Sequence, residues 1–118
     1  MNKLQKSIPI CTVERISDGG QHAAFTDLII YKGYLLCCYR QASSHMSEDG
    51  LIAIYSRKLN RKKGTTHVIE WPNSDLRDHK FLVDGDNKLW VSCYPRILSE
   101  TPAHRQMFAL STDRRAHV

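Results

Sequence analysis

The fold class of this chain is decided by the stretch FTDLIIYKGYLLCCYR, which runs from Phe25 to Arg40. Two apolar runs of strand length flank Lys32-Gly33, and a two-residue connection that contains glycine is typical of a β-hairpin. Neither run shows the 3.6-residue apolar period of a helix. The stretch therefore predicts two antiparallel strands joined by a tight turn.

The same strand-like pattern continues on both sides of this hairpin. Further segments of this kind are PICTVERI (9–16), LIAIYSR (51–57), THVIEW (66–71), the hairpin KFLVDGDNKLWVSCYP (80–95) and QMFALSTD (106–113). About eight strands at spacings near ten residues are typical of an all-β sandwich, barrel or propeller. A chain of 118 residues has the length of one ordinary domain.

The composition excludes several classes of protein. The hydrophobic content of 42% and charged content of 25% are typical of a soluble globular domain. No apolar run approaches the roughly 20 residues of a membrane helix, and the N-terminus lacks the apolar core of a signal peptide. The sequence therefore predicts a cytoplasmic protein without a membrane partner. No phosphate-binding loop or cofactor motif is present, so no cofactor is expected.

The four cysteines argue against a metal site. They form no Cys-x-x-Cys pair, and the adjacent Cys37 and Cys38 must point to opposite faces of a strand. We interpret all four as reduced thiols that act as small apolar residues.

Basic residues concentrate in SRKLNRKKG (56–64), and the whole chain has a formal net charge of +5. Its cations are Arg57, Lys58, Arg61, Lys62 and Lys63. One interpretation is a phosphate-binding patch, and the other is a solvated hairpin loop between two strands. No aromatic residue interleaves with the charges, which favours the solvated loop and makes nucleic acid an unlikely partner.

An internal repeat appears when the two hairpins are aligned. Each reads as a polar stretch with an aspartate, an apolar strand, a glycine turn and a second apolar strand. Asp27 and Asp78 precede the two strands and lie 51 residues apart. A repeat of this length in an all-β chain indicates propeller blades, and chance similarity of two hairpins is the alternative.

Four motifs in chain order carry a resemblance to a known family. They are HAAFTDL (22–28), the Arg40 of YRQ (39–41), His45 with the Asp49-Gly50 turn, and DLRD (75–78). Together they resemble the opening blades of sialidase-like six-bladed β-propellers of the BNR or Asp-box type. The chain departs from the family pattern at Ala23, Gln41 and His79, where the family has Asn, Glu and Pro, and it has no complete Asp box.

This resemblance implies an all-β fold class that is a fragment of a β-propeller, with about two four-stranded antiparallel blades and the start of a third. Residues 1–118 would form a single partial propeller domain. Blade one would cover about 20–71, and an incomplete blade two would cover about 75–113. Because propeller blades bury their faces against neighbouring blades, open apolar faces would remain, and we expect self-association.

The resemblance also assigns a candidate site. His45 and Asp27 are the candidate catalytic residues, and His45 could transfer a proton near neutral pH. The candidate substrate-binding residues are His22, Arg40, Asp49, Asp75, Arg77 and Asp78. Structural roles are the alternatives: an ion pair of Arg40 with Asp27 or Glu48, an exposed loop histidine, and an Arg77–Asp78 pair that braces a loop.

The implied function is that of a sialidase-like fragment related to glycoside hydrolases, inactive alone, with a remnant glycan-binding site. The Tyr–Glu pair and further arginines that sialidases need are missing, so catalysis by this chain is not expected. The expected partner is a glycan, either sialylated or another acidic sugar. A non-catalytic carbohydrate-binding or interaction module is the first alternative, and a small basic nucleic-acid-binding β-domain is the second.

Overall fold

The structure is a computed structural model that describes residues 11, 13–17, 22–98 and 108–111. This part of the chain contains seven strands and no helix. The strands are β1 (His22–Tyr31), β2 (Tyr34–Ala42), β3 (Leu51–Lys58), β4 (Thr65–Ile69), β5 (Ser74–Val83), β6 (Leu89–Ile97) and β7 (Phe108–Ser111). The predicted all-β class is confirmed, and both predicted hairpin turns connect strands as expected.

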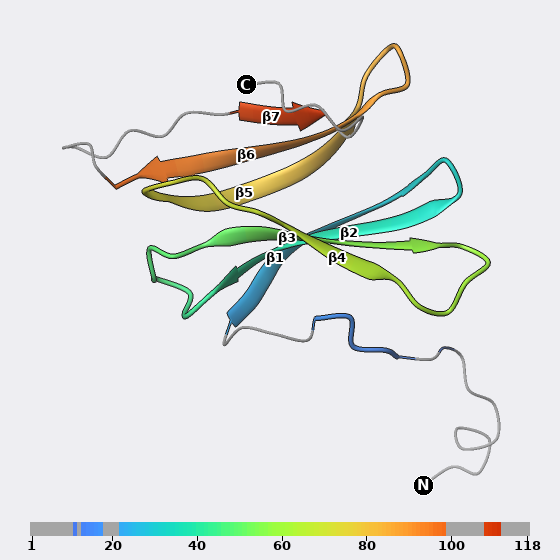
Figure 1. Cartoon of the computed structure of the whole chain (residues 1–118), viewed down its shortest axis with the longest axis horizontal. Coiled ribbons are helices and arrows are strands. Elements are labelled where there is room, and N and C mark those ends of the chain that lie inside the picture. Colours follow the sequence, from blue (N-terminus) through green and yellow to red (C-terminus); the bar gives the residue numbers. More distant parts are fainter. Residues whose placement is uncertain (1–10, 12, 18–21, 99–107, 112–118) are drawn as a thin grey trace, which may run out of the picture.

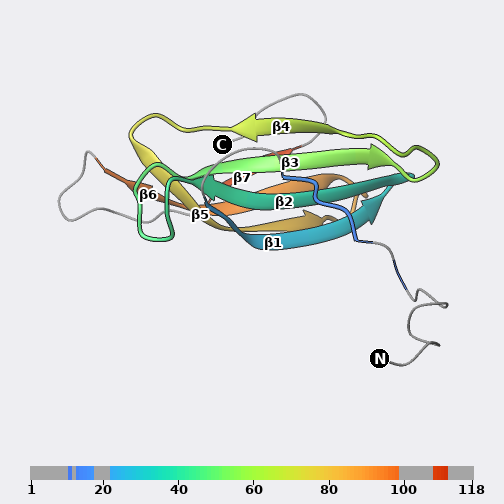
Figure 2. The same cartoon turned by 90° about the horizontal axis from the view of Figure 1, so that it is seen from below.

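The strands form two antiparallel sheets. The first sheet has the order β1-β2-β3-β4, and the second has the order β5-β6-β7, so within each sheet the strands pair in sequence order. Figure 1 shows the sheets as two layers, and Figure 2 shows β1 to β4 side by side in front of the second sheet. The two-residue turn Lys32-Gly33, with φ angles of 47° and 80°, joins β1 directly to β2.

Each sheet begins with a strand that carries a bulge. The pairing register shifts between Ala24 and Asp27 in β1 and between Arg77 and Lys80 in β5. Phe25 and Asp78 occupy the equivalent place in the two bulges, and both have positive φ angles, 58° and 52°. The repeat therefore exists in the backbone, but its alignment differs from the predicted one, because Asp27 corresponds to Lys80 and not to Asp78.

A hydrophobic core joins the two sheets. Its members alternate along β2, β3, β5 and β6, as the period of two predicts. The buried residues are Cys38, Ile52, Leu76, Val91 and Cys93, with Ile54, Ile69 and Phe81 packed against them. Burial raises the pKa of the Cys38 and Cys93 thiols to about 12, so both stay protonated and pack as small apolar groups.

The outer face of the first sheet holds a second cluster. Its buried residues are Cys37, Tyr39, Ala53 and Tyr55, and Ile16 packs against them. Residues 11 and 13–17 form no strand, so the strand predicted for 9–16 is wrong for its described residues. In Figures 1 and 2 this segment instead crosses the outer face of the first sheet. Only Ile16 of its described apolar residues packs on the sheet, because Val13 is 94% exposed and Cys11 is exposed as well.

No helix of the described residues has the length and apolar character needed to cross a membrane.

Candidate functional site

Three separated segments meet at one end of the two sheets. They are the start of β1, the end of β2 with the loop that follows it (43–50), and the start of β5. Antiparallel pairing places His22 opposite Ala42, and the second sheet packs so that Asp75 reaches Arg40. Most of the predicted site residues therefore share one end of the molecule.

Arg40 and Asp75 form a buried ion pair at this end. Nη2 of Arg40 lies 2.9 Å from Oδ1 of Asp75, and both side chains are 0% exposed. The Nε of Arg40 donates to the same oxygen at 3.3 Å. Its terminal nitrogens also donate to the carbonyls of Ser44 and Ser47, at 3.1 and 2.7 Å. The guanidinium is thus enclosed by protein acceptors and presents no surface to a ligand.

Asp75 also binds groups on both sides of the ion pair. Its Oδ1 accepts a hydrogen bond from the Gly50 amide at 2.9 Å, and its Oδ2 accepts one from Nε of Arg77 at 2.6 Å. Arg77 in turn donates to the carbonyls of His45 and Ser47 at 3.2 and 3.0 Å. Arg40, Asp75 and Arg77 form one network, called here the Arg–Asp–Arg network, which fixes the loop 43–50 against β5.

The partner of Arg40 is therefore Asp75, and not Asp27 or Glu48 as the alternative interpretation suggested. Arg77 also pairs with Asp75, because the Nε of Arg77 lies 2.6 Å from Oδ2 of Asp75. Asp78 is exposed in the β5 bulge.

The other two aspartates of the predicted site also bind protein groups. Oδ2 of Asp27 accepts a hydrogen bond from the Phe81 amide at 2.8 Å, which joins the two sheets. Asp49 accepts hydrogen bonds from the hydroxyl and the amide of Ser43 and so closes the loop 43–50. The Ser43 hydroxyl, followed by that of Ser47, holds the pKa of Asp49 well below its usual range. Asp49 is consequently a carboxylate at neutral pH.

Three aromatic rings lie together beside this network, and we call them the ring cluster: His22, Phe25 and His45. The ring centroid of His45 lies 5.6 Å from that of His22 and 5.5 Å from that of Phe25. Phe25 is 41% exposed and has a φ of 58°, which is unusual for a bulky residue. Strained backbone and bulges of this kind concentrate at functional sites, where they redirect a side chain.

Sequence reasoning did not single out Phe25 or the serines of the loop 43–50 as site residues. The bulge that turns the Phe25 ring towards His45 depends on the pairing register of β1 and β2. No residue type in this segment predicts such a bulge. Gly50 was named only as part of a turn, and the structure shows that a side chain there would overlap Asp75 and Arg40. Among the residues that the structure describes, no group of His, Cys, Asp or Glu is arranged to hold a metal ion.

His79 lies in the β5 bulge, where the family pattern has proline, and its side chain is 1% exposed. Burial lowers the pKa of its imidazole, and the backbone of Phe25 and Cys38 opposes part of this effect. The unfolded chain then binds a proton more readily than the folded chain. Stability is full above the unfolded pKa of about 6.5 and is lost as the pH falls below it towards the lower folded pKa.

Urea unfolding at a series of pH values should reveal this loss. We expect the free energy of unfolding to fall by up to about 1.4 kcal/mol per pH unit below pH 6.5, and His79→Leu to remove this component. His67, which is exposed on β4, provides the control, since His67→Asn should leave the pH dependence unchanged. Equal pH profiles for His79→Leu and the parent chain would contradict the prediction.

Comparisons of this chain with protein-family models, with curated proteins and with solved structures find no match. The resemblance to sialidase-like propellers thus remains a prediction from the four motifs.

Proposed function

We propose that this chain is a non-catalytic glycan-binding module of propeller type, with the ring cluster as its contact surface. The observation that carries the proposal is the exposed ring of Phe25, held at a positive φ beside His45 and His22. The apolar face of a sugar ring packs well on aromatic side chains, while imidazole nitrogens exchange hydrogen bonds with its hydroxyls. The four sialidase-like motifs support the same class of ligand.

Most charged side chains at this end of the sheets are already engaged by protein groups, which argues for glycan binding rather than glycan hydrolysis. A sialidase binds the sugar carboxylate through arginines, yet Arg40 and Arg77 are already paired with Asp75. Glycoside hydrolysis also requires an acid or base within reach of the glycosidic bond. Asp27 and Asp49 accept hydrogen bonds from protein amides, and the other exposed titratable residues of this end include His45, Glu48 and Asp78.

The arrangement of the sheets supports the propeller part of the proposal. The first sheet is a four-stranded meander, which is the form of a propeller blade, and it packs face to face on a second meander. Leu28 and Ile30 on β1 and Val68 on β4 are more than half exposed. They lie on the same outer face as Ala53 and Cys37, which is where another blade or a second copy of the chain would pack. Self-association therefore remains an expectation, and light scattering measures it.

Phe25→Asn tests the contact surface. Asparagine tolerates a positive φ, so we expect the free energy of unfolding to stay constant or to rise by up to about 1 kcal/mol. Loss of the ring should weaken glycan binding about fivefold, since an aromatic contact contributes on the order of 1 kcal/mol. Calorimetric titration with sialyllactose and with lactose measures the binding of an acidic and a neutral sugar.

Lys32→Asn is the matched control for this experiment. Lys32 also has a positive φ of 47°, but it lies in the turn at the opposite end of β1. It should show the same tolerance of asparagine and no change in sugar binding. If the parent chain binds neither sugar, or if both variants bind as the parent does, the ring cluster is not a glycan site.

A further inference from the structure

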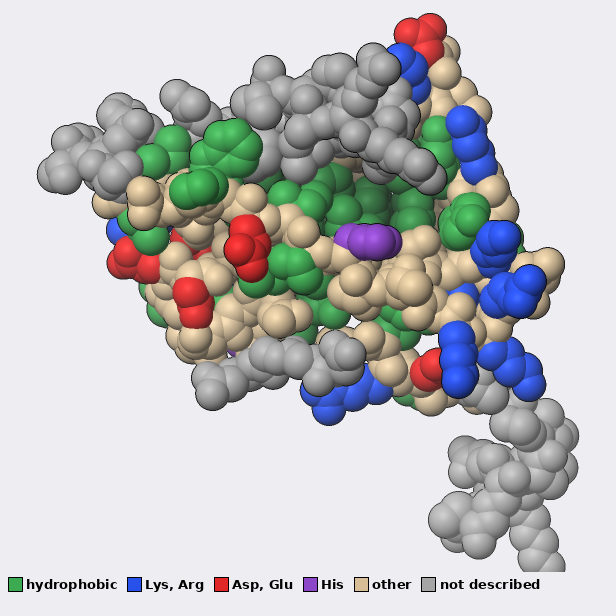
Figure 3. All heavy atoms as spheres, in the orientation of Figure 1, with side chains coloured by type: hydrophobic (Ala, Val, Ile, Leu, Met, Phe, Trp, Pro, Cys, Tyr) green, Lys and Arg blue, Asp and Glu red, His purple; other side chains and the backbone are tan. Residues whose placement is uncertain are grey.

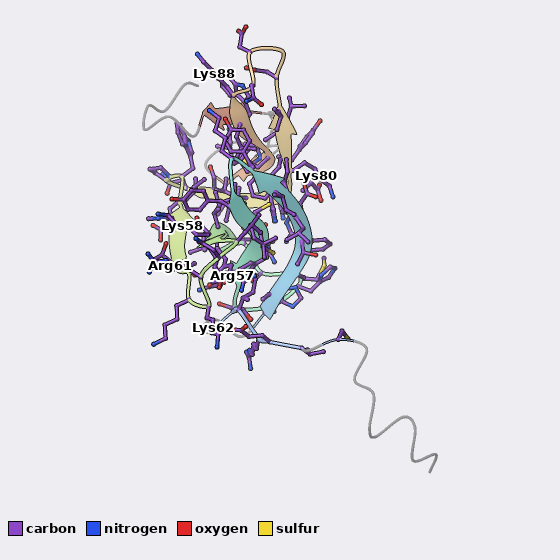
Figure 4. All side chains as sticks on the ribbon, turned by 90° about the vertical axis from the view of Figure 1, so that its right-hand side faces the viewer. Arg57, Lys58, Arg61, Lys62, Lys80 and Lys88 are labelled. Carbon is purple, nitrogen blue, oxygen red and sulfur yellow. The ribbon has the colours of Figure 1, made fainter. Side chains whose placement is uncertain are left out.

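The turn between β3 and β4 carries the highest concentration of positive charge in the described chain. It lines an open groove of about 580 Å³, which takes in Arg57, Lys58, Arg61, Lys62 and Lys63 together with Tyr34. Figure 3 shows Lys and Arg side chains gathered along the edge of the molecule at which this turn lies. Figure 4 shows four of these cations around the turn, with Lys80 and Lys88 apart from them.

The groove has a defined local structure. Nη1 of Arg57 donates to the carbonyl of Arg61 at 3.3 Å, and the Arg61 amide donates to the carbonyl of Lys58 at 3.0 Å. Gly64 lies so close to Tyr55 and to the carbonyl of Ser56 that a side chain at this position would overlap both. These contacts fold the turn back on itself and bring its cations around one hollow.

The charges of this groove are not neutralised by the described parts of the protein. The ion pairs found among the described residues involve Arg40, Arg77 and Arg96, and none involves a cation of the groove. No acidic residue lines the hollow. Five like charges within seven residues repel one another, and a bound anion would relieve that repulsion.

The fold also supplies the aromatic residue that the sequence of this segment lacks. Tyr34, at the start of β2, lines the groove and is 37% exposed. The ammonium of Lys58 lies 6.0 Å from the centre of its ring. One ring is too little for the stacking platform that a single-stranded nucleic acid needs. The volume instead falls in the range of sites for small molecules.

We infer that this groove is a binding site for a compact ligand with two or three linked phosphate groups. Lysine and arginine donate charge-assisted hydrogen bonds to phosphate oxygens, and several phosphates on one small ligand can engage several cations at once. The shared chemistry is the linked phosphates, whether they come from free polyphosphate or from a nucleoside triphosphate. This site lies roughly 20 Å along β2 from Arg40 and is independent of the proposed glycan surface.

Calorimetric titration with tripolyphosphate and with ATP tests the inference. We expect saturable binding of one tripolyphosphate per chain, weakened as the ionic strength rises to about 0.15 M. The double variant Lys62→Gln/Lys63→Gln should bind about tenfold more weakly. Lys80→Gln/Lys88→Gln removes the same charge from β5 and from the turn between β5 and β6, where both lysines are exposed, and should change binding by less than about twofold.

Tyr34→Leu separates the two sources of phosphate. A selective loss of ATP binding would mean that the ring packs against the base, and equal effects on both ligands would identify the phosphates alone as the recognised group. Three results would overturn the inference. They are the absence of saturable tripolyphosphate binding, equal losses in the two lysine double variants, and much tighter binding of a single-stranded oligonucleotide than of tripolyphosphate.

Discussion

Replacing Asp75 with asparagine should lower the free energy of unfolding by about 3–5 kcal/mol, the cost typical of removing one partner of a buried ion pair. The carboxylate of Asp75 accepts hydrogen bonds from Arg40, Arg77 and the Gly50 amide. The neutral amide leaves the charge of Arg40 buried without a counter-ion, and it offers one acceptor oxygen where two are used. Urea denaturation monitored by tryptophan fluorescence measures the loss.

Glu48→Gln provides the control for this measurement. Glu48 pairs with Arg96 at 3.9 Å, but both side chains are well exposed. An exposed ion pair contributes about 0–1 kcal/mol, so this variant should remain close to the parent chain. A loss of less than about 1 kcal/mol for Asp75→Asn would mean that Arg40 and Asp75 do not form a buried pair.

Gly50→Ala should lower the free energy of unfolding by about 3 kcal/mol through the same network. A methyl group at position 50 would overlap Oδ1 of Asp75 and Nε of Arg40, and it would lie 3.0 Å from Cζ of Arg40. Relief of this overlap requires the ion pair to separate or the loop 43–50 to move. The effect should not add to that of Asp75→Asn, because both changes act on one interaction.

Gly85→Ala is the matched glycine control. A methyl group at position 85, in the turn between β5 and β6, meets no atom within 4 Å. This change should be neutral or slightly stabilising, since alanine restricts the unfolded chain. If Gly50→Ala proves as mild as Gly85→Ala, the loop 43–50 does not pack on Asp75 as described.

Local patterns in the sequence were sufficient to predict the two hairpins and their turns, but they also predicted a strand at 9–16 that the described residues do not form. The runs on either side of Lys32-Gly33 alternate or are continuously apolar, and such segments form strands in most tertiary settings. The bulges could not be predicted, because they appear only in the register between two strands, and the two repeats were consequently misaligned. The segment 9–16 shows the complementary error, since Ile16 packs on a sheet without pairing to it.

The candidate site was predicted as a set of residues but not as a set of contacts. The four motifs predicted His22, Arg40, His45, Asp49 and Asp75 as site residues, and the structure places these residues at one end of the sheets. The partner of Arg40 lies 35 residues away on the other sheet, and this pairing depends on how the two sheets stack. The basic turn was interpreted as a solvated loop because Tyr34, the nearby ring, comes from a different strand.

The hydrogen bonds between the sheets run in both directions. Asp27 of the first sheet accepts from the Phe81 amide of the second, and Asp75 of the second sheet accepts from the Gly50 amide at the edge of the first. Separation of the two sheets would therefore leave one carboxylate on each sheet without its hydrogen-bond donor. Hydrogen exchange at these two amides should require almost complete unfolding rather than a local fluctuation. Two sheets with separate backbone ladders are in this way made into one cooperative unit.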